Sequence, residues 1–194
     1  MSLTNRQWRR GWSIAALLVA LQFAVATATA TTASAVPIPT DVQRALPATQ
    51  ALGQADLKFW GFAVYKARLW VAADFQVDQF DRHTFGLELV YARALEGRDI
   101  VARSMDEMNR MGAVPGEQAA RWREGLARVI PSVLQGERLL AIHRPSEGLE
   151  FLHNGKSTGT IRDAAFARRF LDIWLSTSTS EPQMRRDLLT LKPL

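Results

Sequence analysis

Alternating hydrophobic and polar positions predict strands in the middle of the chain. The clearest case is FGLELVY, residues 85–91, in which every odd position is hydrophobic and the even positions include Glu88. The stretch 57–72, LKFWGFAVYKARLWVA, is rich in aromatic and β-branched residues. It predicts two strands or one bent strand, with Gly61 as a bulge or a point of close backbone approach. Further strands are predicted over 138–144, 149–153 and 156–161.

Hydrophobic residues at helical spacing predict helices before and after the later strands. In 98–111 the stripe consists of Val101, Met105 and Met108, and in 116–130 it consists of Trp122, Leu126, Val129 and Ile130. A methionine stripe at this spacing is most often core, although flexible methionines also suit a ligand wall. Asp163 suits the N-cap of a third helix. The buried face of that helix would carry Phe166, Phe170, Ile173 and Trp174, and a last amphipathic piece is predicted over 183–189.

This order of strands, helices, strands and helices indicates an α+β fold. We expect a large antiparallel sheet with helices on one face, rather than alternating βα units. The chain after residue 35 has the length of one domain. Segment 36–52 contains Pro37, Pro39 and Pro47, which predicts an extended stretch leading into a single domain over 53–194.

Residues 1–35 have the layout of a secretory signal peptide. Three arginines give a positive start, residues 12–26 form an uncharged apolar run, and a small-residue tract ends in Ala33-Ser34-Ala35. The apolar run is short for a bilayer span. We therefore expect cleavage after Ala35, a periplasmic or secreted protein, and no stable membrane span in the mature chain.

The charge of the chain depends largely on that segment. The full chain has 24 Lys and Arg against 19 Asp and Glu, and the three arginines within 1–35 are unopposed. Without them the balance is 21 to 19, which gives no reason to expect a nucleic-acid partner. The absence of cysteine excludes disulfides, thiolate catalysis and the acylated cysteine of a lipoprotein.

Gly155-Lys156-Ser157 resembles the end of a phosphate-binding loop, but its context differs. The loop pattern requires glycine at position 150, which is Glu150, and a helix directly after the serine. A predicted strand follows instead. Asn154-Gly155 is a strong signal for a hairpin turn, because both residues tolerate positive φ. We therefore expect no bound nucleotide.

Other catalytic and metal-binding patterns are weak. His143 and His153 lie on neighbouring predicted strands and could come close, but no third ligand is paired with them. Partly exposed sheet histidines are the simpler interpretation. The chain also lacks the G-x-S-x-G elbow of a serine hydrolase. We predict no metal site, no cofactor and no catalytic residue.

Three stretches carry a resemblance to a known family. The first is 52–72, LGQADLKFWGFAVYKARLWVA, and the second is 87–100, LELVYARALEGRDI. The third and most specific lies within 148–189, where F-x-x-N-G-x-x-x-G-x-I-x-D precedes F-A-x-x-F-x-x-I-W-L and RRDLL. These stretches resemble the bacterial, exported branch of the chalcone isomerase-like family.

The resemblance implies an open-faced β-sandwich with a ligand cleft between the sheet and its helical layer. In the plant enzymes of this family an Arg, a Thr, a Tyr and an Asn serve ring closure, while other members bind fatty acids in the same cleft. Trp60 stands where the pattern has the Thr, and Lys58 is the cation nearest the expected Arg. The helical Tyr has no counterpart, since Tyr65 and Tyr91 lie in predicted strands, and Asn109 matches the Asn. Isomerase activity is therefore expected to be lost or altered.

We expect a non-catalytic exported module that binds a small apolar or amphipathic ligand, such as a fatty acid, in the cleft. Lys58 or Arg103 would meet a ligand carboxylate. The expected ligand-binding residues are Lys58, Trp60, Phe62, Arg103, Met105, Met108 and Asn109. One alternative is an intramolecular isomerase (lyase) of the chalcone isomerase type with an unknown substrate. Another is a ligand-free structural or interaction domain in which Trp60 plugs the cleft.

Overall fold

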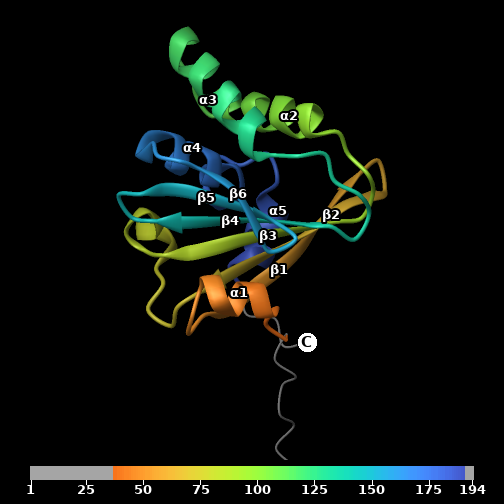
Figure 1. Ribbon diagram of the computed structural model, residues 1–194, viewed down its shortest axis with the longest axis vertical. Coiled ribbons are helices and arrows are strands. Elements are labelled where there is room, and N and C mark those ends of the chain that lie inside the picture. The colour runs from red at the N-terminus through yellow and green to blue at the C-terminus, as the bar shows by residue number, and fades with distance from the viewer. Residues whose placement is uncertain (1–36, 191–194) are drawn as a thin grey trace, which may run out of the picture. The chain divides into compact units, whose positions relative to one another are not determined.

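Within residues 37–190, six antiparallel strands form one open sheet, and each strand pairs with its neighbour in sequence (Figure 1). The computed structural model describes residues 37–190, so the predicted signal segment 1–35 lies outside the described residues. The strands are β1 Gln50–Phe59, β2 Phe62–Val71, β3 Phe85–Tyr91, β4 Arg138–Arg144, β5 Gly148–His153 and β6 Lys156–Ile161. Because the order is sequential, hairpins or excursions through helices make every connection.

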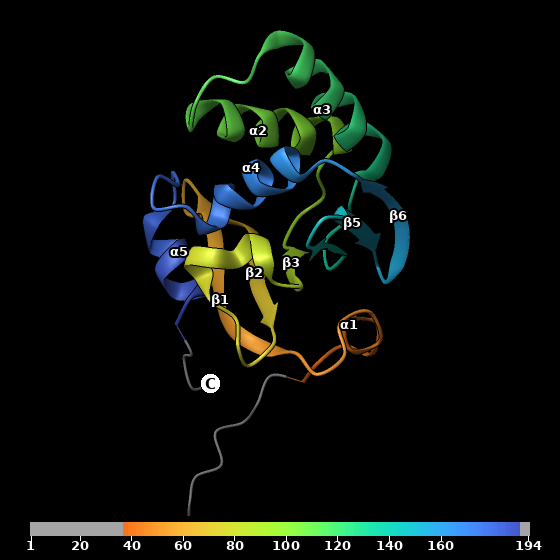
Figure 2. The same ribbon diagram turned by 90° about the vertical axis from the view of Figure 1, so that its left-hand side faces the viewer.

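Helices cover both faces of the sheet, but unequally (Figures 1 and 2). One face carries α2 Gly97–Arg110, α3 Gly116–Val129, α4 Ala164–Leu175 and α5 Pro182–Leu188. The other face carries the short helix α1 Thr40–Ala45. A 3-10 turn, Val77–Arg82, lies between β2 and β3. The predicted α+β fold, an antiparallel sheet with a helical layer, is confirmed. No helix within 37–190 has the length and apolar character needed to cross a membrane.

The alternation in β3, which the sequence predicts, separates two hydrophobic cores. The side chains of Phe85, Leu87, Leu89 and Tyr91 belong to the larger core, which faces α2 to α5. The smaller core on the opposite face contains Val42 of α1 and Leu46 directly after it, together with Trp70, Leu140, Ile142 and Leu152 of the sheet. The central strands are therefore buried on both faces.

The predicted hairpin turn at Asn154-Gly155 is confirmed. Both residues have positive φ, 48° and 79°, and they join β5 to β6 in a two-residue turn. Lys156 and Ser157 begin β6, and the Ser157 hydroxyl donates to Glu150. The glycine-lysine-serine run therefore belongs to a sheet edge.

Asp163 caps α4, as predicted. Its Oδ1 accepts a hydrogen bond from the Phe166 amide at 2.9 Å, and its Oδ2 accepts one from Trp122 Nε1 at 2.8 Å. The cap therefore satisfies an amide at the helix terminus and also ties α4 to α3.

Two local predictions are wrong. Gly61 is not a bulge, because Trp60 and Gly61, with φ of 51° and 83°, form the turn between β1 and β2. Segment 36–52 is not extended throughout, because residues 40–45 form α1 and β1 begins at Gln50. The helix forms in this proline-containing stretch because Val42 and Leu46, four residues apart, bury their side chains against the sheet.

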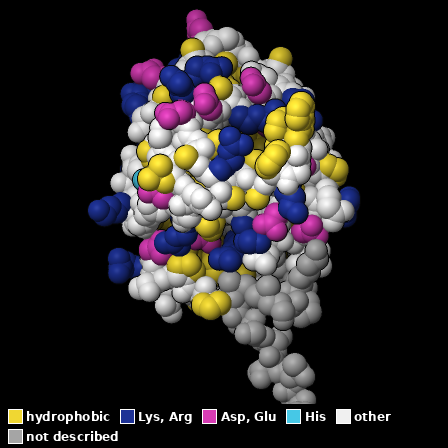
Figure 3. Space-filling model, turned by 90° about the vertical axis from the view of Figure 1, so that its right-hand side faces the viewer, with side chains coloured by type: hydrophobic (Ala, Val, Ile, Leu, Met, Phe, Trp, Pro, Cys, Tyr) yellow, Lys and Arg dark blue, Asp and Glu magenta, His cyan; other side chains and the backbone are white. Residues whose placement is uncertain are grey.

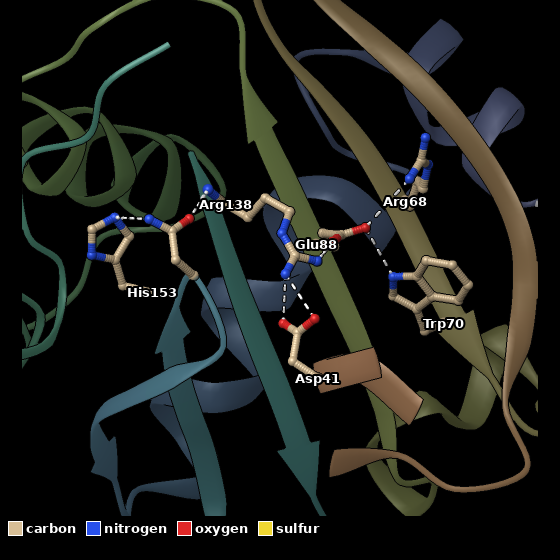
Figure 4. A network of polar contacts seen from close by, with 7 residues as sticks. Asp41, Arg68, Trp70, Glu88, Arg138 and His153 are labelled. Atoms are coloured by element: carbon tan, nitrogen blue, oxygen red, sulfur yellow. Dashed lines mark hydrogen bonds and ion pairs between the residues drawn. The ribbon is translucent and has the colours of Figure 1, made fainter. Parts of the chain in front are cut away.

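A buried carboxylate lies beneath α1 (Figure 4). Glu88 of β3 is fully buried and accepts hydrogen bonds from Arg138 Nη1 at 2.7 Å and Trp70 Nε1 at 3.1 Å. Arg138 also binds both carboxylate oxygens of Asp41 on α1, each at 2.7 Å, and Arg68 approaches Glu88 at 3.7 Å. Arg138 thus joins α1 to the centre of the sheet.

We expect the substitution Arg138→Met to lower the free energy of unfolding by about 3 kcal/mol, because the buried charge of Glu88 would keep only the more distant Arg68 as an ionic partner. The double variant Glu88→Gln/Arg138→Met should lose less than the single variant, since the fully buried carboxylate is then replaced by a neutral amide. Urea denaturation measures both values. The control is Arg128→Met, whose partner Glu124 is exposed, with a loss of about 0.5 kcal/mol or less. Equal losses for the single and double variants would contradict this role of the ion pair.

Candidate functional site

An apolar cavity of about 380 Å³ lies between the sheet and its helical layer. The sheet contributes residues from β1 to β5, and α2, α4 and α5 contribute the opposite wall. Prominent apolar residues of the lining are Leu87, Leu89, Leu139, Ala141, Phe151, Ile100, Phe170, Ile173, Trp174 and Met184.

The floor of the cavity follows from strand pairing. Leu87 lies opposite Ala141, Leu89 lies opposite Leu139, and Ala141 lies opposite Phe151 on the far side. Ala141 is the smallest of these side chains, so the floor is lowest at the centre of the sheet. The roof is aromatic: Phe170 of α4 contacts Phe151 at a ring-centroid distance of 5.5 Å. Space therefore remains where a small residue faces the helical layer.

Two tyrosines lie side by side at one end of the floor. Tyr65 of β2 pairs with Tyr91 of β3, and their rings meet edge to face with centroids 5.9 Å apart. The Tyr65 hydroxyl accepts a hydrogen bond from Trp174 Nε1 at 3.1 Å. Burial raises the pKa of both tyrosines well above the ordinary value of 10.0. Both hydroxyls therefore stay protonated at neutral pH and can donate hydrogen bonds.

The solvent-exposed lining residues mark the mouth of the cavity. They are Lys58, Phe59, Arg93, Asp99, Arg103, Ser180 and Glu181. Lys58 and Arg93 make no ion pair with any residue of the described range 37–190, so both cations are available to a ligand. The mouth therefore combines available positive charge with an exposed aromatic ring, Phe59.

The lining contains the buried acid Glu107, and two arginines balance its negative charge. Its Oε1 lies 2.6 Å from Arg103 Nη2 and its Oε2 lies 2.9 Å from Arg110 Nε, both within α2. Burial alone would raise the pKa of Glu107, but hydrogen bonds from Arg110 and Ser180 and the charges of Arg103 and Arg110 hold this pKa below its ordinary value. Arg103 is thus committed to Glu107, although it lines the cavity.

The family model for chalcone isomerase-like proteins matches residues 53–190. The chain belongs to the chalcone isomerase-like family. No curated protein matches it.

A solved structure shares the fold of this family member. The Arabidopsis thaliana fatty-acid binding protein AtFAP1 superposes with a TM-score of 0.59 over 74% of this chain and 87% of its own. The two sequences are 13% identical over this match, so the likeness concerns the fold.

Only two of the seven residues expected to bind ligand line the cavity. These are Lys58 and Arg103. Trp60 and Phe62 lie at the β1–β2 turn with 87% and 72% of their surfaces exposed, and neither belongs to the lining. Trp60 therefore does not plug the cavity.

The remaining three expected residues lie on other faces of α2 or at its end. Met105 and Met108 are fully buried in the larger core and do not line the cavity. Asn109 is exposed, and its Oδ1 accepts a hydrogen bond from the Val114 amide at 3.3 Å. Asn109 thus supports the loop after α2.

Sequence reasoning missed Arg93, the two tyrosines as part of a cavity wall, and the aromatic roof. The alternation of β3 continues into the loop, so Arg93 follows Tyr91, Leu89 and Leu87 at intervals of two residues, and all four line the cavity. That pattern is visible in the sequence. The roof residues were expected on a buried helix face, but the space beneath them depends on helix packing.

The two strand histidines lie apart. His143 pairs with Leu149 and His153 pairs with Leu139, which places them toward opposite ends of the β4–β5 pair. His143 Nδ1 lies 2.8 Å from the His83 carbonyl, and His153 Nε2 lies 3.1 Å from Glu137. Within residues 37–190 no cluster of three or more His, Asp or Glu residues is suited to hold a metal ion.

We expect Glu107→Gln to lower the free energy of unfolding by about 2 kcal/mol near neutral pH, because two charge-assisted hydrogen bonds are weakened. The folded protein lowers the pKa of Glu107, so its stabilising effect is present above the ordinary value of 4.5 and is lost as the pH falls through the folded value. The difference between wild type and variant should therefore shrink from about pH 7 to about pH 3. Urea unfolding at several pH values measures it. A difference in unfolding free energy that stays constant over this pH range would contradict the lowered pKa of Glu107 in the folded protein.

Proposed function

We propose that this protein binds a small amphipathic molecule with an acyl chain, such as a fatty acid, without converting it chemically. The observation that carries the proposal is the cavity itself, about 380 Å³ in volume, with an apolar interior and a mouth that contains two cations, Lys58 and Arg93, without an ion pair within residues 37–190. Small-molecule sites typically have volumes of about 300–1,000 Å³ and a few placed polar groups. The fatty-acid binding function of AtFAP1, which has the same fold, adds support.

The side chains along β3 change from charged at the mouth to apolar in the interior, and this order favours one orientation of the ligand. Arg93 lies at the mouth, Tyr91 follows it, and Leu89 and Leu87 lie deeper in the cavity. A carboxylate would remain near Arg93 and Lys58, where it keeps a counter-charge and access to water. Burying it deeper would leave the charge unpaired, which is costly. The acyl chain would extend over Leu87 and Ala141 toward Phe151.

The polar groups of the lining suit retention of a ligand better than its conversion. Tyr65 and Tyr91 have raised pKa values, so they act as hydrogen-bond donors and not as bases. Glu107 is held by Arg103 and Arg110. We therefore assign these groups to ligand orientation.

We also propose that the protein is exported, on the basis of the signal pattern in residues 1–35. Cleavage after Ala35 would leave the described range 37–190 intact, including α1 and its contact with the sheet. We expect the protein recovered from the periplasm or the medium to begin at Val36, which intact-mass measurement can check. Recovery of only the full-length chain from the cytoplasm would contradict export.

Filling the cavity tests the binding proposal directly. We expect wild-type protein to bind a C16 or C18 fatty acid at micromolar concentration, and Ala141→Phe to weaken binding at least tenfold, because a ring would occupy the floor. Titration followed by native mass spectrometry measures both affinities. Ala141→Leu provides a less disruptive variant if the phenylalanine impairs folding.

The matched control is Ala127→Phe, the same substitution at an exposed position of α3 outside the lining. It should bind the fatty acid as wild type does. Lys58→Glu should weaken binding of the fatty acid but not of the corresponding fatty alcohol, which carries no charge. Wild-type protein that binds no fatty acid, or a folded Ala141→Phe variant with unchanged affinity, would contradict the proposal.

A further inference from the structure

The turn between β1 and β2 carries an exposed aromatic cluster. Phe59, Trp60 and Phe62 are 63%, 87% and 72% exposed, and the rings of Phe59 and Trp60 stack with centroids 5.7 Å apart. Together with Gly61 these residues form what we call the aromatic tip, residues 59–62. In Figure 3 hydrophobic side chains gather on the face that includes this end of the hairpin, with Lys and Arg side chains around them. Exposure of several adjacent aromatic side chains to water is unfavourable. Such a patch indicates a surface that contacts another molecule.

Trp60 also occupies a backbone position that disfavours it. The tip and the β5–β6 turn are both two-residue turns with positive φ at each position, 51° and 83° in one and 48° and 79° in the other. The β5–β6 turn uses Asn154-Gly155, the residues this turn favours. A bulky aromatic residue at positive φ is strained. Neither turn geometry nor packing within the fold accounts for Trp60, so its place at the tip points to an interaction outside the domain.

The aromatic tip adjoins the mouth of the cavity. Phe59 belongs to both, and the preceding residues Leu57 and Lys58 also line the cavity. Lys58 and Arg93, which make no ion pair within residues 37–190, lie at this mouth. Hydrophobic side chains and free positive charge are therefore next to each other at this end of the molecule.

We propose that the aromatic tip inserts into the surface of a lipid membrane, with Lys58 and Arg93 near anionic headgroups. Tryptophan is enriched at the membrane–water interface, where its ring lies at the headgroup level, and phenylalanine adds apolar contact below it. A projecting turn suits this shallow insertion better than a flat face does. The basic residues add attraction to anionic lipids.

This docking brings the mouth of the cavity to the bilayer. A lipid-like ligand would then enter or leave without crossing water. That consequence rests on the proposed function, whereas membrane docking itself depends only on the tip and its cations.

Binding to vesicles of phosphatidylcholine with about a quarter phosphatidylglycerol tests the proposal. Among the described tryptophans only Trp60 is exposed, since Trp70, Trp122 and Trp174 are buried. Vesicle binding should therefore shift tryptophan fluorescence to shorter wavelength, and lipids brominated near the headgroup should quench it. Variants must be compared in the same processed form, because the apolar run 12–26 would itself bind lipid.

The informative variant is Trp60→Asn, which places the favoured residue in the turn. We expect it to weaken vesicle binding at least tenfold and to abolish the fluorescence shift. Its melting temperature should equal or exceed that of wild type, and its affinity for a monomeric fatty acid in solution should be unchanged. Leu134→Asn, which removes the one large exposed hydrophobic side chain of the described residues outside the aromatic tip, is the matched control and should keep vesicle binding.

Several outcomes would overturn membrane docking by the tip. Wild-type protein without vesicle binding would do so, as would equal binding by Trp60→Asn or an equal loss for Leu134→Asn. Self-association without lipid that Trp60→Asn abolishes would assign the tip to a contact between copies of this chain. The cavity-filled variant Ala141→Phe should still bind vesicles, so a failure of ligand binding and a failure of docking can be told apart.

Discussion

The ion pair between Glu88 and Arg138 constrains the centre of the sheet and, through it, the cavity. β3 is buried on both faces, so its alternating side chains must separate into one set that faces α1 and one that faces the helical layer. Glu88 is stable only where Arg138 and Trp70 can bind it, on the α1 face. Leu87 and Leu89 must then face the helices and form the cavity floor. A slip of one residue would carry the charge into the cavity, so the ion pair fixes the register of the strand.

The cavity results from incomplete contact between this floor and the helical layer. Ala141 leaves space at the centre of the sheet, and the aromatic side chains of α4 span it instead of filling it. The polar end is built from different elements, with Arg93 following β3, Lys58 on β1, and the tyrosines on β2 and β3. One sheet thus forms both the apolar interior and the polar mouth of the cavity. This is possible because the strand residues that face the helical layer extend from the centre of the sheet to its edge.

Most of the fold can be predicted from the sequence, because strand and helix periodicity are local. The β3 alternation, the Asn154-Gly155 turn and the Asp163 cap all depend on residues within a few positions of each other. Helix α1 cannot be predicted in this way, since it owes its place to distant contacts with Trp70 and Leu140.

The cavity lining was harder to predict for a related reason. The stripe of α2 containing Met105 and Met108 is in the core, whereas the neighbouring stripe of Ile100, Ser104 and Glu107 faces the cavity. A rotation of the helix by about one residue decides between the two, and packing against other elements sets that rotation. The family resemblance puts Trp60 where the pattern has the Thr of the cleft, but a two-residue turn places it at the tip.

The central claim is that an acyl chain occupies the space between β3 and α4, with its carboxylate at the mouth. A crystal structure of the protein with a fatty acid brominated at the end of its chain tests this directly, because the bromine can be located by its anomalous scattering. We expect the bromine beside Phe151 and Phe170 and the carboxylate within reach of Lys58 or Arg93. Bromine found only on the outer surface, or a cavity without the ligand at saturating concentration, would contradict the claim.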